Sequence, residues 1–453
     1  MSDTIITTYP FTGEVLKEYP LFTDKEVAAL IHKSKEIFFG WKKESLQERC
    51  KLLQKLADVL YQQMEKCATL ITKEMGKPYR ESIAEIEKCI NLIDFYEKNA
   101  EQFLADELIE TEAQESFISY DPIGCVLGIM PWNYPFWQVM RFAIPTITAG
   151  NTILLKHASN VTGCSLRIQE LFEEAGYPIG CFQTLIVSHK QLESIIESDI
   201  IKAISLTGSE KAGRTIAEIA GKNLKKTVLE LGGNNACILW EDADLDKYLD
   251  TIVKARIQNA GQSCIAAKRF IVVEDIYNEF LEKFEQAFRN IKFGSPLDSK
   301  TQIGTLARID LAEEVQKQVN ESIKKGAAVL IGNKRDKAFF EPTILTNVSP
   351  GMPAFDNEIF GPVAAVIKAK DREHSIELAS LSDFGLGTML FTQDIEGARK
   401  QIENIEDGAF FINEMVKSDS RLPFGGTKYS GYGRELSREG ILEFVNIKTV
   451  YIK

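Results

Sequence analysis

The chain has 453 residues, of which 44% are hydrophobic and 26% are charged, a composition typical of soluble globular proteins. This length exceeds that of one ordinary domain, so two or three domains are expected. The formal net charge of −12 argues against a nucleic acid or an anionic membrane as a partner, because both require a basic surface.

The first hundred residues are predicted to be helical. Thr23 and Ser45 each precede a glutamate by three positions, the pattern of a capping box, and so mark two helix starts. The second helix is expected to stop at Gly76 and Pro78. A further amphipathic helix is expected over residues 80–104.

From about residue 115, short β-rich runs alternate with helical stretches. Strands are predicted at ESFISY, CVLGIM, NTILLK, QTLIV, AISLTG and KTVLEL, with helices over 161–174 and 209–220. Such alternation indicates βαβ units and a parallel sheet that binds ligands at the carboxyl ends of its strands. A second α/β series is predicted from helices near 275–290 and 309–324 and strands near 363–369 and 387–391. The final EFVNIKTVYI predicts a terminal strand, and such strands commonly pair with another subunit.

Cysteine and histidine usage indicates the compartment and limits the chemistry. The eight cysteines include no CxxC pair, and the four histidines show no spacing typical of zinc ligands, so no metal site is expected. The N-terminus lacks the basic start and apolar core of a signal peptide, and no apolar run approaches the roughly 20 residues of a membrane-spanning helix. These features predict a reduced, cytoplasmic protein.

Two short strings carry the strongest chemical signal, ELGGN at 230–234 and NAGQSC at 259–264. They place a lone carboxylate, Glu230, and a lone thiol, Cys264, 34 positions apart beside small residues that let a ligand approach the backbone. A thiol attacks as a thiolate, and a positioned carboxylate can take a proton from it or from water. The pair predicts covalent catalysis, although a single cysteine is more often a buried small hydrophobe.

Three further segments lie where strands are predicted to end. In Pro131–Pro135 (PWNYP), Asn133 either donates to a developing oxyanion or caps the next helix. Gly208 and Ser209 open a near P-loop at a strand-to-helix junction, where backbone N–H groups suit a phosphate. Lys156 ends a strand and suits a ribose or phosphate, unless it is a solvated loop lysine.

Taken in order, these motifs resemble those of the NAD(P)-dependent aldehyde dehydrogenase superfamily. The matching strings are EMGKP, PWNYP, LLK, TGS, ELGGN, GQSC, EIFGPV and PFGGTKYSGYGRE, and they span essentially the whole chain. The resemblance implies an α/β fold in three parts. These are a Rossmann-like cofactor-binding domain over 1–103 and 123–231, an α/β catalytic domain over 232–435, and a small β oligomerisation element over 104–122 and 436–453.

The resemblance also implies roles for individual residues. Cys264 would be the nucleophile that forms a thiohemiacetal and then a thioester, and Glu230 would activate the hydrolytic water. Asn133 with the Cys264 N–H would form the oxyanion hole. The residues expected at an NAD(P) cofactor are Ile129, Met130, Pro131, Trp132, Lys156, Ser159, Gly208, Ser209, Leu231, Gly232, Glu358 and Phe360.

Two positions refine the expected cofactor and substrate. Ser159 stands where NAD-preferring members usually carry a glutamate that would repel a 2′-phosphate, so NADP is the expected preferred cofactor, with NAD second. Arg141 stands where an arginine can hold a carboxylate bidentately, as in succinate-semialdehyde dehydrogenases, unless it is a surface or domain-interface arginine. The other expected substrate contacts are Ser418, Ser420 and Phe424.

The sequence therefore predicts oxidation of an aldehyde, with succinate semialdehyde as the expected substrate, by a cytoplasmic homodimer or homotetramer. Three alternatives stay open. One is a broad-specificity or aminoaldehyde dehydrogenase in which Arg141 is structural. Another is a catalytically silent family member that serves as a binding or structural protein, and the third is a CoA-acylating enzyme. Glu230 disfavours the last, because acyl transfer to CoA needs no base for water.

Overall fold

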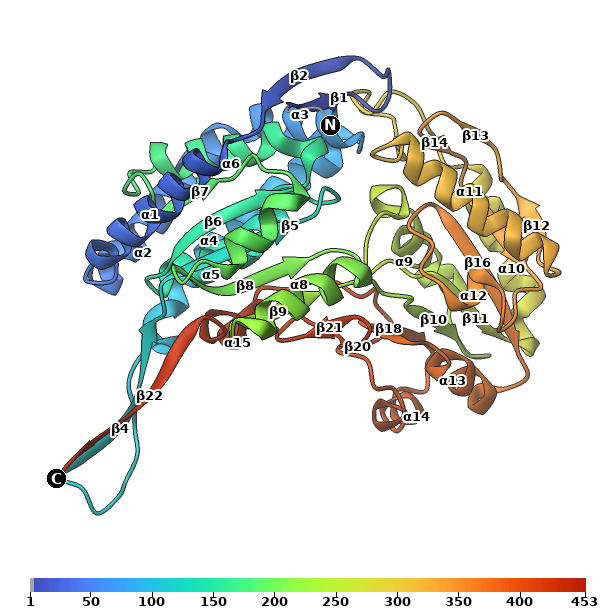
Figure 1. Cartoon of the computed structure of the whole chain (residues 1–453). Helices are drawn as coiled ribbons and strands as arrows, with labels where there is room; N and C mark the ends of the chain where they lie inside the picture. The colour runs from blue at the N-terminus through green and yellow to red at the C-terminus, as the bar shows by residue number, and fades with distance from the viewer. Residues whose placement is uncertain (1–3) are drawn as a thin grey trace.

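Six strands form a sheet in the order β21-β9-β8-β5-β6-β7 in the computed structural model, which describes residues 4–453 (Figure 1). Neighbouring strands are parallel except for β21, which is antiparallel to β9. The strands are β5 (Cys125–Met130), β6 (Thr152–His157), β7 (Phe182–Thr184), β8 (Ile201–Thr207), β9 (Lys226–Glu230) and β21 (Gly431–Tyr432).

Both faces of this sheet are covered by helices, because successive strand residues point to opposite faces and are apolar on each. Val126 and Ile153 share a core with α2 (Leu46–Gln62), α3 (Met64–Met75), α4 (Tyr79–Phe103), α5 (Trp137–Thr148) and α6 (Thr162–Glu174). Leu127 and Leu154 pack in a second core with α1 (Asp24–Trp41), α7 (Leu192–Glu197) and α8 (Glu210–Lys222). The predicted parallel sheet is therefore confirmed.

Helix starts in the N-terminal region were predicted well, and the remaining structure there was not. Thr23 forms a complete capping box with Glu26. Ser45 accepts the Glu48 N–H at 3.2 Å, but Glu48 itself pairs with Lys51. The expectation of helix throughout residues 1–100 is wrong for β1 (Thr4–Thr8) and β2 (Val15–Pro20), which form an antiparallel hairpin. The second helix also breaks at residue 63, so α3 is a separate helix that ends at residue 76.

A second sheet has the order β12-β15-β16-β11-β10-β18-β19 and is parallel except between β12 and β15. This confirms the second α/β series. Its strands are β10 (Ala236–Leu239), β11 (Arg269–Val273), β12 (Ala328–Ile331), β15 (Thr343–Thr346), β16 (Val363–Ala369), β18 (Thr388–Phe391) and β19 (Phe410–Ile412). The helices around it are α9 (Leu245–Ile257), α10 (Glu274–Arg289), α11 (Ile309–Lys324), α12 (Pro353–Asp356), α13 (Arg372–Ser380) and α14 (Ile395–Arg399).

Two short antiparallel strand pairs complete the second part of the chain. They are β13 (Arg335–Asp336) with β14 (Phe339–Phe340), and β17 (Phe384–Gly385) with β20 (Thr427–Lys428). The final helix, α15 (Ser437–Leu442), leads the chain back toward α4 and α5 and into the last strand.

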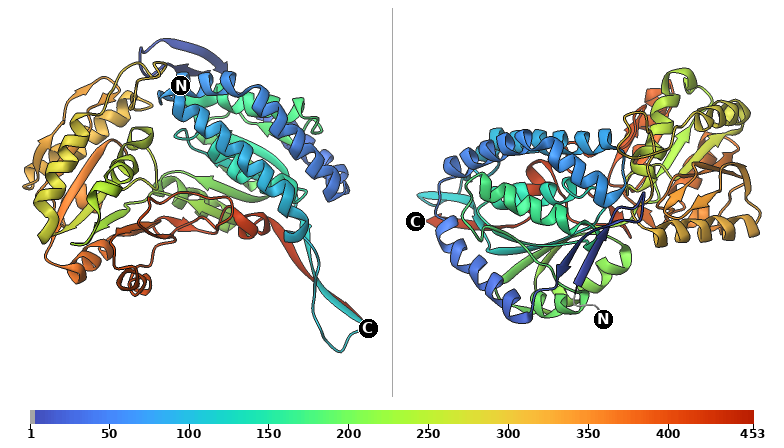
Figure 2. Two further views of the ribbon diagram at one scale, coloured as in Figure 1. Left: turned by 180° about the vertical axis from the view of Figure 1, so that it is seen from behind. Right: turned by 90° about the horizontal axis from the view of Figure 1, so that it is seen from above.

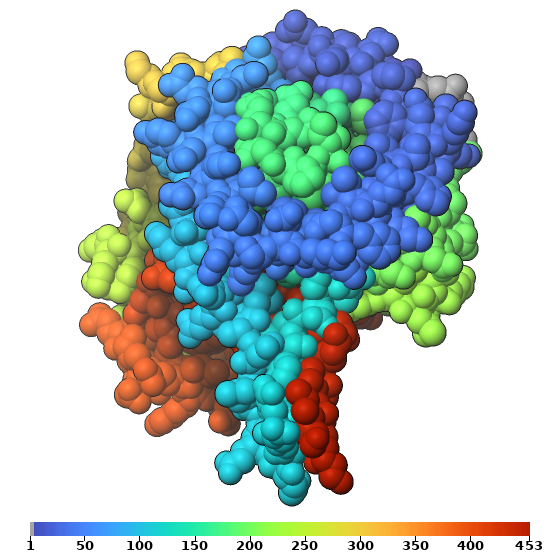
Figure 3. All heavy atoms as spheres, turned by 90° about the vertical axis from the view of Figure 1, so that its left-hand side faces the viewer, coloured from blue at the N-terminus to red at the C-terminus, as the bar shows by residue number. Residues whose placement is uncertain are grey.

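A narrow β arm projects away from both sheets (Figures 1, 2 and 3). It consists of β3 (Glu107–Leu108), β4 (Glu115–Pro122) and β22 (Val445–Ile452), in the order β22-β4-β3. The predicted terminal strand is confirmed, and it pairs with β4 of its own chain along eight positions. Pairing of the arm with another subunit, and the division of the chain into three parts at the predicted boundaries, stay predictions.

No helix within residues 4–453 combines the length and the apolar run needed to cross a membrane.

Candidate active site

A cavity of about 530 Å³ lies where β5, β6, β8 and β9 end. Every residue that was predicted to contact a cofactor lines it, from Ile129 at the end of β5 to Phe360 in a loop of the second part. The segment Gly208-Ser209 does lie at a strand-to-helix junction, with Ser209 as the N-cap of α8. The structure therefore brings these predicted residues together in one place.

Polar groups in this cavity lack partners of their own. Within residues 4–453, the Lys156 ammonium makes no hydrogen bond or ion pair, and burial lowers its pKa to about 8. The Thr207 hydroxyl and the Asn160 amide nitrogen are buried without a hydrogen-bond partner in the same range. The charge of Lys156 also lowers the pKa of His189, which lines the same cavity. Unpaired donors and uncompensated positive charge fit a phosphate-bearing dinucleotide.

The part of the cavity near Cys264 is shaped by Glu358 and by two glycines. A Glu358 oxygen accepts the Gly233 N–H at 3.1 Å and pairs with the Lys268 ammonium at 3.0 Å. A Cβ at Gly232 would lie 2.5 Å from the other Glu358 oxygen, so a side chain there would displace this carboxylate. The rings of Trp132 and Phe360 pack edge to face, with their centres 5.7 Å apart.

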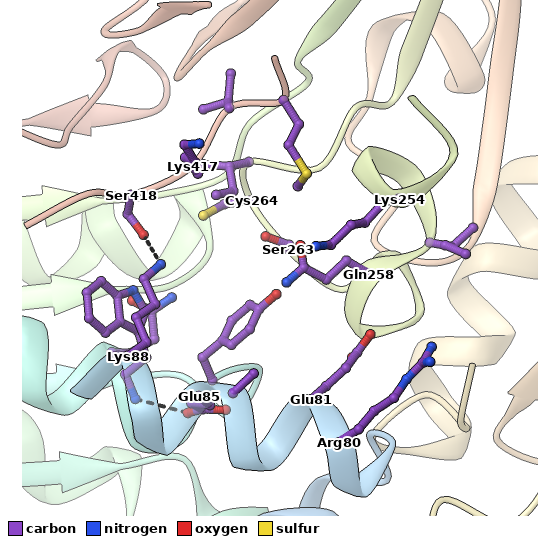
Figure 4. A pocket seen from close by; sticks show the side chains of 18 of the residues that line it. Arg80, Glu81, Glu85, Lys88, Lys254, Gln258, Ser263, Cys264, Lys417 and Ser418 are labelled. Atoms are coloured by element: carbon purple, nitrogen blue, oxygen red, sulfur yellow. Dashed lines mark hydrogen bonds between the residues drawn. The ribbon is translucent and has the colours of Figure 1, made fainter. Parts of the chain in front are cut away.

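A second cavity, of about 730 Å³, opens between α4, α5, α9 and the loop over 415–424 (Figure 4). The predicted substrate residues Arg141, Ser418 and Phe424 line it. Ser420 does not, and its carbonyl accepts the Ser437 N–H at 2.9 Å. Cys264 and Gln138 line both cavities, so the thiol lies where the two meet.

The loop that carries Cys264 has an unusual backbone. Asn259, Ala260 and Gly261 all have positive φ angles, of 55°, 53° and 72°. Such a run costs free energy at the non-glycine positions and persists only where surrounding contacts hold it.

Two buried cations hold this loop by its carbonyl oxygens. Arg256 donates to the Gly261 carbonyl at 2.8 Å and to the Ala267 carbonyl at 2.7 Å. Lys268 donates to the carbonyls of Ser263 at 2.8 Å and Cys264 at 2.6 Å. The Cys264 N–H donates to no group within residues 4–453, so it is available to a ligand.

Asn133 is fixed beside this loop. Its side-chain nitrogen donates to the backbone carbonyl of Gln262 at 3.1 Å. Its backbone carbonyl accepts a hydrogen bond from the side-chain nitrogen of Asn259 at 2.7 Å. The alternative in which Asn133 caps the next helix is wrong. A Glu85 carboxylate oxygen instead accepts the N–H groups at the start of α5, at 2.8 and 2.9 Å.

The Glu230 carboxyl is buried and the Cys264 thiol is half-buried, and desolvation is the main influence on the pKa of each. Burial raises the pKa of the Cys264 thiol to about 11, while the charges of Arg141 and Lys268 act to lower it. Glu230 ends β9, and neither of its carboxylate oxygens has a hydrogen-bond partner within residues 4–453. Burial, followed by the nearby Glu435 carboxylate, raises the pKa of Glu230 well above its usual value. A carboxyl group with a raised pKa is a stronger base once ionised.

Arg141 is not a surface arginine, because only 2% of its side chain is accessible. The alternative of a domain-interface arginine stays open. The Arg141 guanidinium forms an ion pair with Glu435 and lies 4.6 Å from the centre of the Phe424 ring. Its Nη2 atom is buried without a hydrogen-bond partner in the described chain. The pairing with Glu435 was missed from the sequence, although Glu435 ends the PFGGTKYSGYGRE string.

The strand that carries Glu230 is covered by a late segment of the chain. The Leu231 N–H donates to the Ser430 carbonyl at 3.0 Å, and the Ser430 hydroxyl donates to the Gly232 carbonyl at 2.6 Å. Gly431 has a φ of 105°, and a Cβ there would lie 2.1 Å from the Leu229 carbonyl oxygen. Only glycine fits this approach. Residues 430–432 therefore close the edge of the sheet beside Glu230.

No group of three or more His, Cys, Asp or Glu side chains suited to a metal ion occurs within residues 4–453.

The Cys264 thiol thus lies where a dinucleotide-like cavity meets a second, charged cavity, and the Asn133 amide lines the first of them. The Glu230 carboxyl is buried outside both linings, and its charge acts on the thiol. The model of the aldehyde dehydrogenase family matches residues 1–450, and the chain belongs to that family. The predicted family and its α/β fold are therefore confirmed.

Similar proteins have more specific names. The chain is 47% identical over 451 residues to a probable succinate-semialdehyde dehydrogenase (NADP+) of Synechocystis, with 99% of each chain covered. It is 44% identical over 454 residues to succinate-semialdehyde dehydrogenase (NADP+) 1 of Mycobacterium tuberculosis, again with 99% of each covered. The chain also superposes on a crystal structure of succinic semialdehyde dehydrogenase from Streptococcus pyogenes in complex with NADP+. The TM-score is 0.97 and the identity is 37%, with 99% of each chain covered.

Proposed function

We propose that the protein oxidises succinate semialdehyde to succinate and prefers NADP+ to NAD+ as the acceptor. The observation that carries this proposal is the position of Cys264 at the junction of two cavities, one lined by unpaired phosphate-type donors and one by cationic side chains. The names of the similar proteins support the same substrate and cofactor.

In the proposed reaction the Cys264 sulfur bonds to the aldehyde carbon while the thiol proton passes to Glu230. The carbonyl oxygen becomes an oxyanion that accepts hydrogen bonds from the Cys264 N–H and from the second N–H of the Asn133 amide. One such donor contributes about 3 kcal/mol to lowering the barrier. The oxidised dinucleotide, when bound, supplies the hydride acceptor.

Hydrolysis of the thioester on Cys264 completes the proposed turnover. Glu230 first releases to solvent the proton that it took from the thiol. Ionised again, it takes a proton from a water molecule whose oxygen bonds to the thioester carbon, and the carbon–sulfur bond breaks to release the carboxylic acid and the Cys264 thiolate. Because burial and Glu435 raise the pKa of Glu230, the fraction of Glu230 able to act as base increases with pH.

The proposed NADP+ preference rests on the adenosine end of the cofactor cavity. Ser159 presents no negative charge there, while Lys156 has no partner within residues 4–453 and lies close enough to His189 to lower its pKa. A 2′-phosphate would supply the missing counter-charge. NAD+ carries no such phosphate and would leave Lys156 uncompensated.

The proposed substrate class follows from the charge of the second cavity. The lining is net positive, with five cations, Arg80, Lys88, Arg141, Lys254 and Lys417, against three acids, Glu81, Glu85 and Asp250. A cationic aminoaldehyde would meet this charge unfavourably, whereas an aldehyde with a distal carboxylate would be attracted by it. We propose Arg141, Ser418 and Phe424 as the residues around that distal group. Ser420 lies outside the cavity lining and would act only through its loop.

Assembly and location are part of the proposal. The arm leaves Ile447 and Tyr451 exposed, at 61% and 55%, on a strand edge that a second subunit could cover, which supports a homodimer or homotetramer. Cytoplasmic location is proposed from cysteine usage, which suits a reducing compartment.

An aldehyde panel with each cofactor tests the proposal. Succinate semialdehyde, butanal and 4-aminobutanal should be compared by kcat/KM for NADPH or NADH formation, with and without CoA. We expect the highest kcat/KM with succinate semialdehyde and NADP+, with no requirement for CoA. A preference for butanal or 4-aminobutanal would favour a general or aminoaldehyde dehydrogenase. No reduced cofactor with any aldehyde would indicate a silent family member, and turnover only with CoA would indicate acylating oxidation.

A further inference from the structure

Lys88, on α4, is a half-buried cation that has no carboxylate partner within residues 4–453. Its ammonium donates to the Ser418 hydroxyl oxygen at 2.7 Å and lies 4.0 Å from the centre of the Trp137 ring. Figure 4 shows Lys88 and Ser418 pointing toward one another across the second cavity. The other two ammonium hydrogens have no protein acceptor in the described chain. A half-buried ammonium without a carboxylate partner favours an anionic ligand.

The carboxylates near Lys88 are already committed to other groups. Glu85 pairs with Lys77 at 2.5 Å, and its other oxygen accepts two N–H groups of α5. Asp419 is held by Arg421 at 2.6 Å. Neither acid is therefore free to neutralise Lys88.

Lys88 differs in this respect from Arg141 and Lys417. Arg80 and Lys254 also form no ion pair within residues 4–453, but their charges act on the Glu81 carboxyl. The charge of Arg141 is compensated by its buried ion pair with Glu435, and Lys417 pairs with Glu414 at 2.9 Å. Burial and the charge of Arg141 lower the pKa of Lys88 to about 8, as expected for an ammonium that faces positive charge without a bound anion.

We propose that Lys88 and Ser418 form the site that binds the distal carboxylate of the aldehyde, and that Lys88 is the residue that determines specificity for dicarboxylic semialdehydes. The Ser418 hydroxyl accepts from Lys88, so its own hydrogen is free to donate to a carboxylate oxygen. Lys88 supplies the charge, and Ser418 supplies the neighbouring donor. Arg141 is paired with Glu435, but its Nη2 atom has no hydrogen-bond partner in the described chain and would be a further donor at the side of the same site. This inference rests on the proposed function.

The test compares Lys88→Met with the matched control Lys417→Met. Both substitutions remove one positive charge from the same cavity, but the Lys417 ammonium already has a carboxylate partner. The measurement is the ratio of kcat/KM for succinate semialdehyde to kcat/KM for butanal. We expect Lys88→Met to lower this ratio about 30-fold or more, through KM for succinate semialdehyde, and Lys417→Met to change it less than about threefold. Equal ratios in the two variants would overturn the proposal.

Two further variants keep the test decisive if Lys88→Met does not fold. Lys88→Arg keeps the charge and should retain most of the preference, whereas Ser418→Ala should lower the ratio about fivefold by removing one donor. NADP+ binding and the melting temperature establish that each variant is folded. An unchanged ratio in folded Ser418→Ala, together with a lost preference in folded Lys88→Arg, would overturn the proposal.

The wild-type ratio separates this inference from the proposed function. If the wild-type enzyme does not prefer succinate semialdehyde to butanal, the proposed substrate is wrong. If it does and Lys88→Met retains that preference, only the role of Lys88 is wrong.

Discussion

The two cavities that meet at Cys264 are built in different ways. The cofactor cavity is formed largely by strand ends, helix starts and glycines, so its shape depends on backbone that local motifs specify. The second cavity is formed by long charged side chains from α4, α5 and α9 and a distant loop, and its charge depends on which cation is paired with which acid. The first is therefore readable from short sequence strings, whereas the second becomes clear only from pairings in three dimensions.

The largest effect is expected where the two cavities meet. Cys264→Ala should lower kcat by at least about 10⁴-fold, because no other group can form the thioester, while NADP+ binding is retained. Steady-state NADPH formation and cofactor titration check both parts. Cys50→Ala, at a half-buried cysteine in α2, is the matched control and should keep activity within about twofold. Residual thioester formation in Cys264→Ala would contradict the assignment of the nucleophile.

A smaller loss is expected from Asn133, which touches the reaction from the cofactor side. Asn133→Ala should lower kcat about 10²- to 10³-fold by removing one oxyanion donor. Its effect on helix content should be negligible, because Glu85 and not Asn133 holds the start of α5. Stopped-flow NADPH formation measures the change in kcat, and circular dichroism measures the helix content. A loss of helix with unchanged kcat would mean that Asn133 is structural.

Ser159 tests how far the cofactor cavity alone sets the choice of dinucleotide. Ser159→Glu should lower kcat/KM for NADP+ about 100-fold relative to NAD+, because a carboxylate would repel the 2′-phosphate. Ser159→Gln, which is similar in size but neutral, should change this ratio much less. The comparison uses initial rates with each cofactor at saturating aldehyde. Equal ratios for Glu and Gln would show that charge at this position does not govern the preference.

The smallest expected effect is a pH dependence of the same preference. The pKa of Lys156 is about 8, so its ammonium is charged below that pH and loses its proton above it. The ratio of kcat/KM for NADP+ to that for NAD+ should therefore fall as pH rises, by up to about tenfold per unit between pH 8 and 9.5. Lys156→Met should have a lower ratio than the wild type, and this ratio should not change with pH. A wild-type ratio that rises or stays level over this range would contradict the role of Lys156.

Much of the fold was predictable because local signals agree with tertiary structure. The capping box at Thr23 and the alternation of apolar strands with helices both appear as expected. Helix α5 was missed for a physical reason. All twelve of its residues are buried, including polar ones, and Pro145 lies inside it, where a proline usually ends a helix. The hairpin of β1 and β2 was missed because each strand has only five or six residues and only one residue of each is buried.

The candidate site likewise divides into features with a local sequence signal, which were predicted, and long-range contacts, which were not. The strings around Cys264, Glu230 and Asn133 were found because each is contiguous in the sequence. The Lys88–Ser418 contact joins residues 330 positions apart, and nothing in the sequence around either residue indicates it. The pairing of Arg141 with Glu435 is equally long-range. Such pairings depend on how separate elements pack, and composition or periodicity carries no record of them.

The closure of strand β9 by residues 430–432 has a consequence for synthesis of the protein. Ser430 reaches the Gly232 carbonyl from 198 positions away, so the edge of the strand beside Glu230 is covered only after nearly the whole chain has left the ribosome. The cofactor sheet can begin to form much earlier, because β5 to β9 are consecutive in sequence. A nascent chain could therefore hold a folded nucleotide site, with Cys264 already made, long before Glu230 is enclosed. Enclosure of Glu230 therefore requires the late segment 430–432.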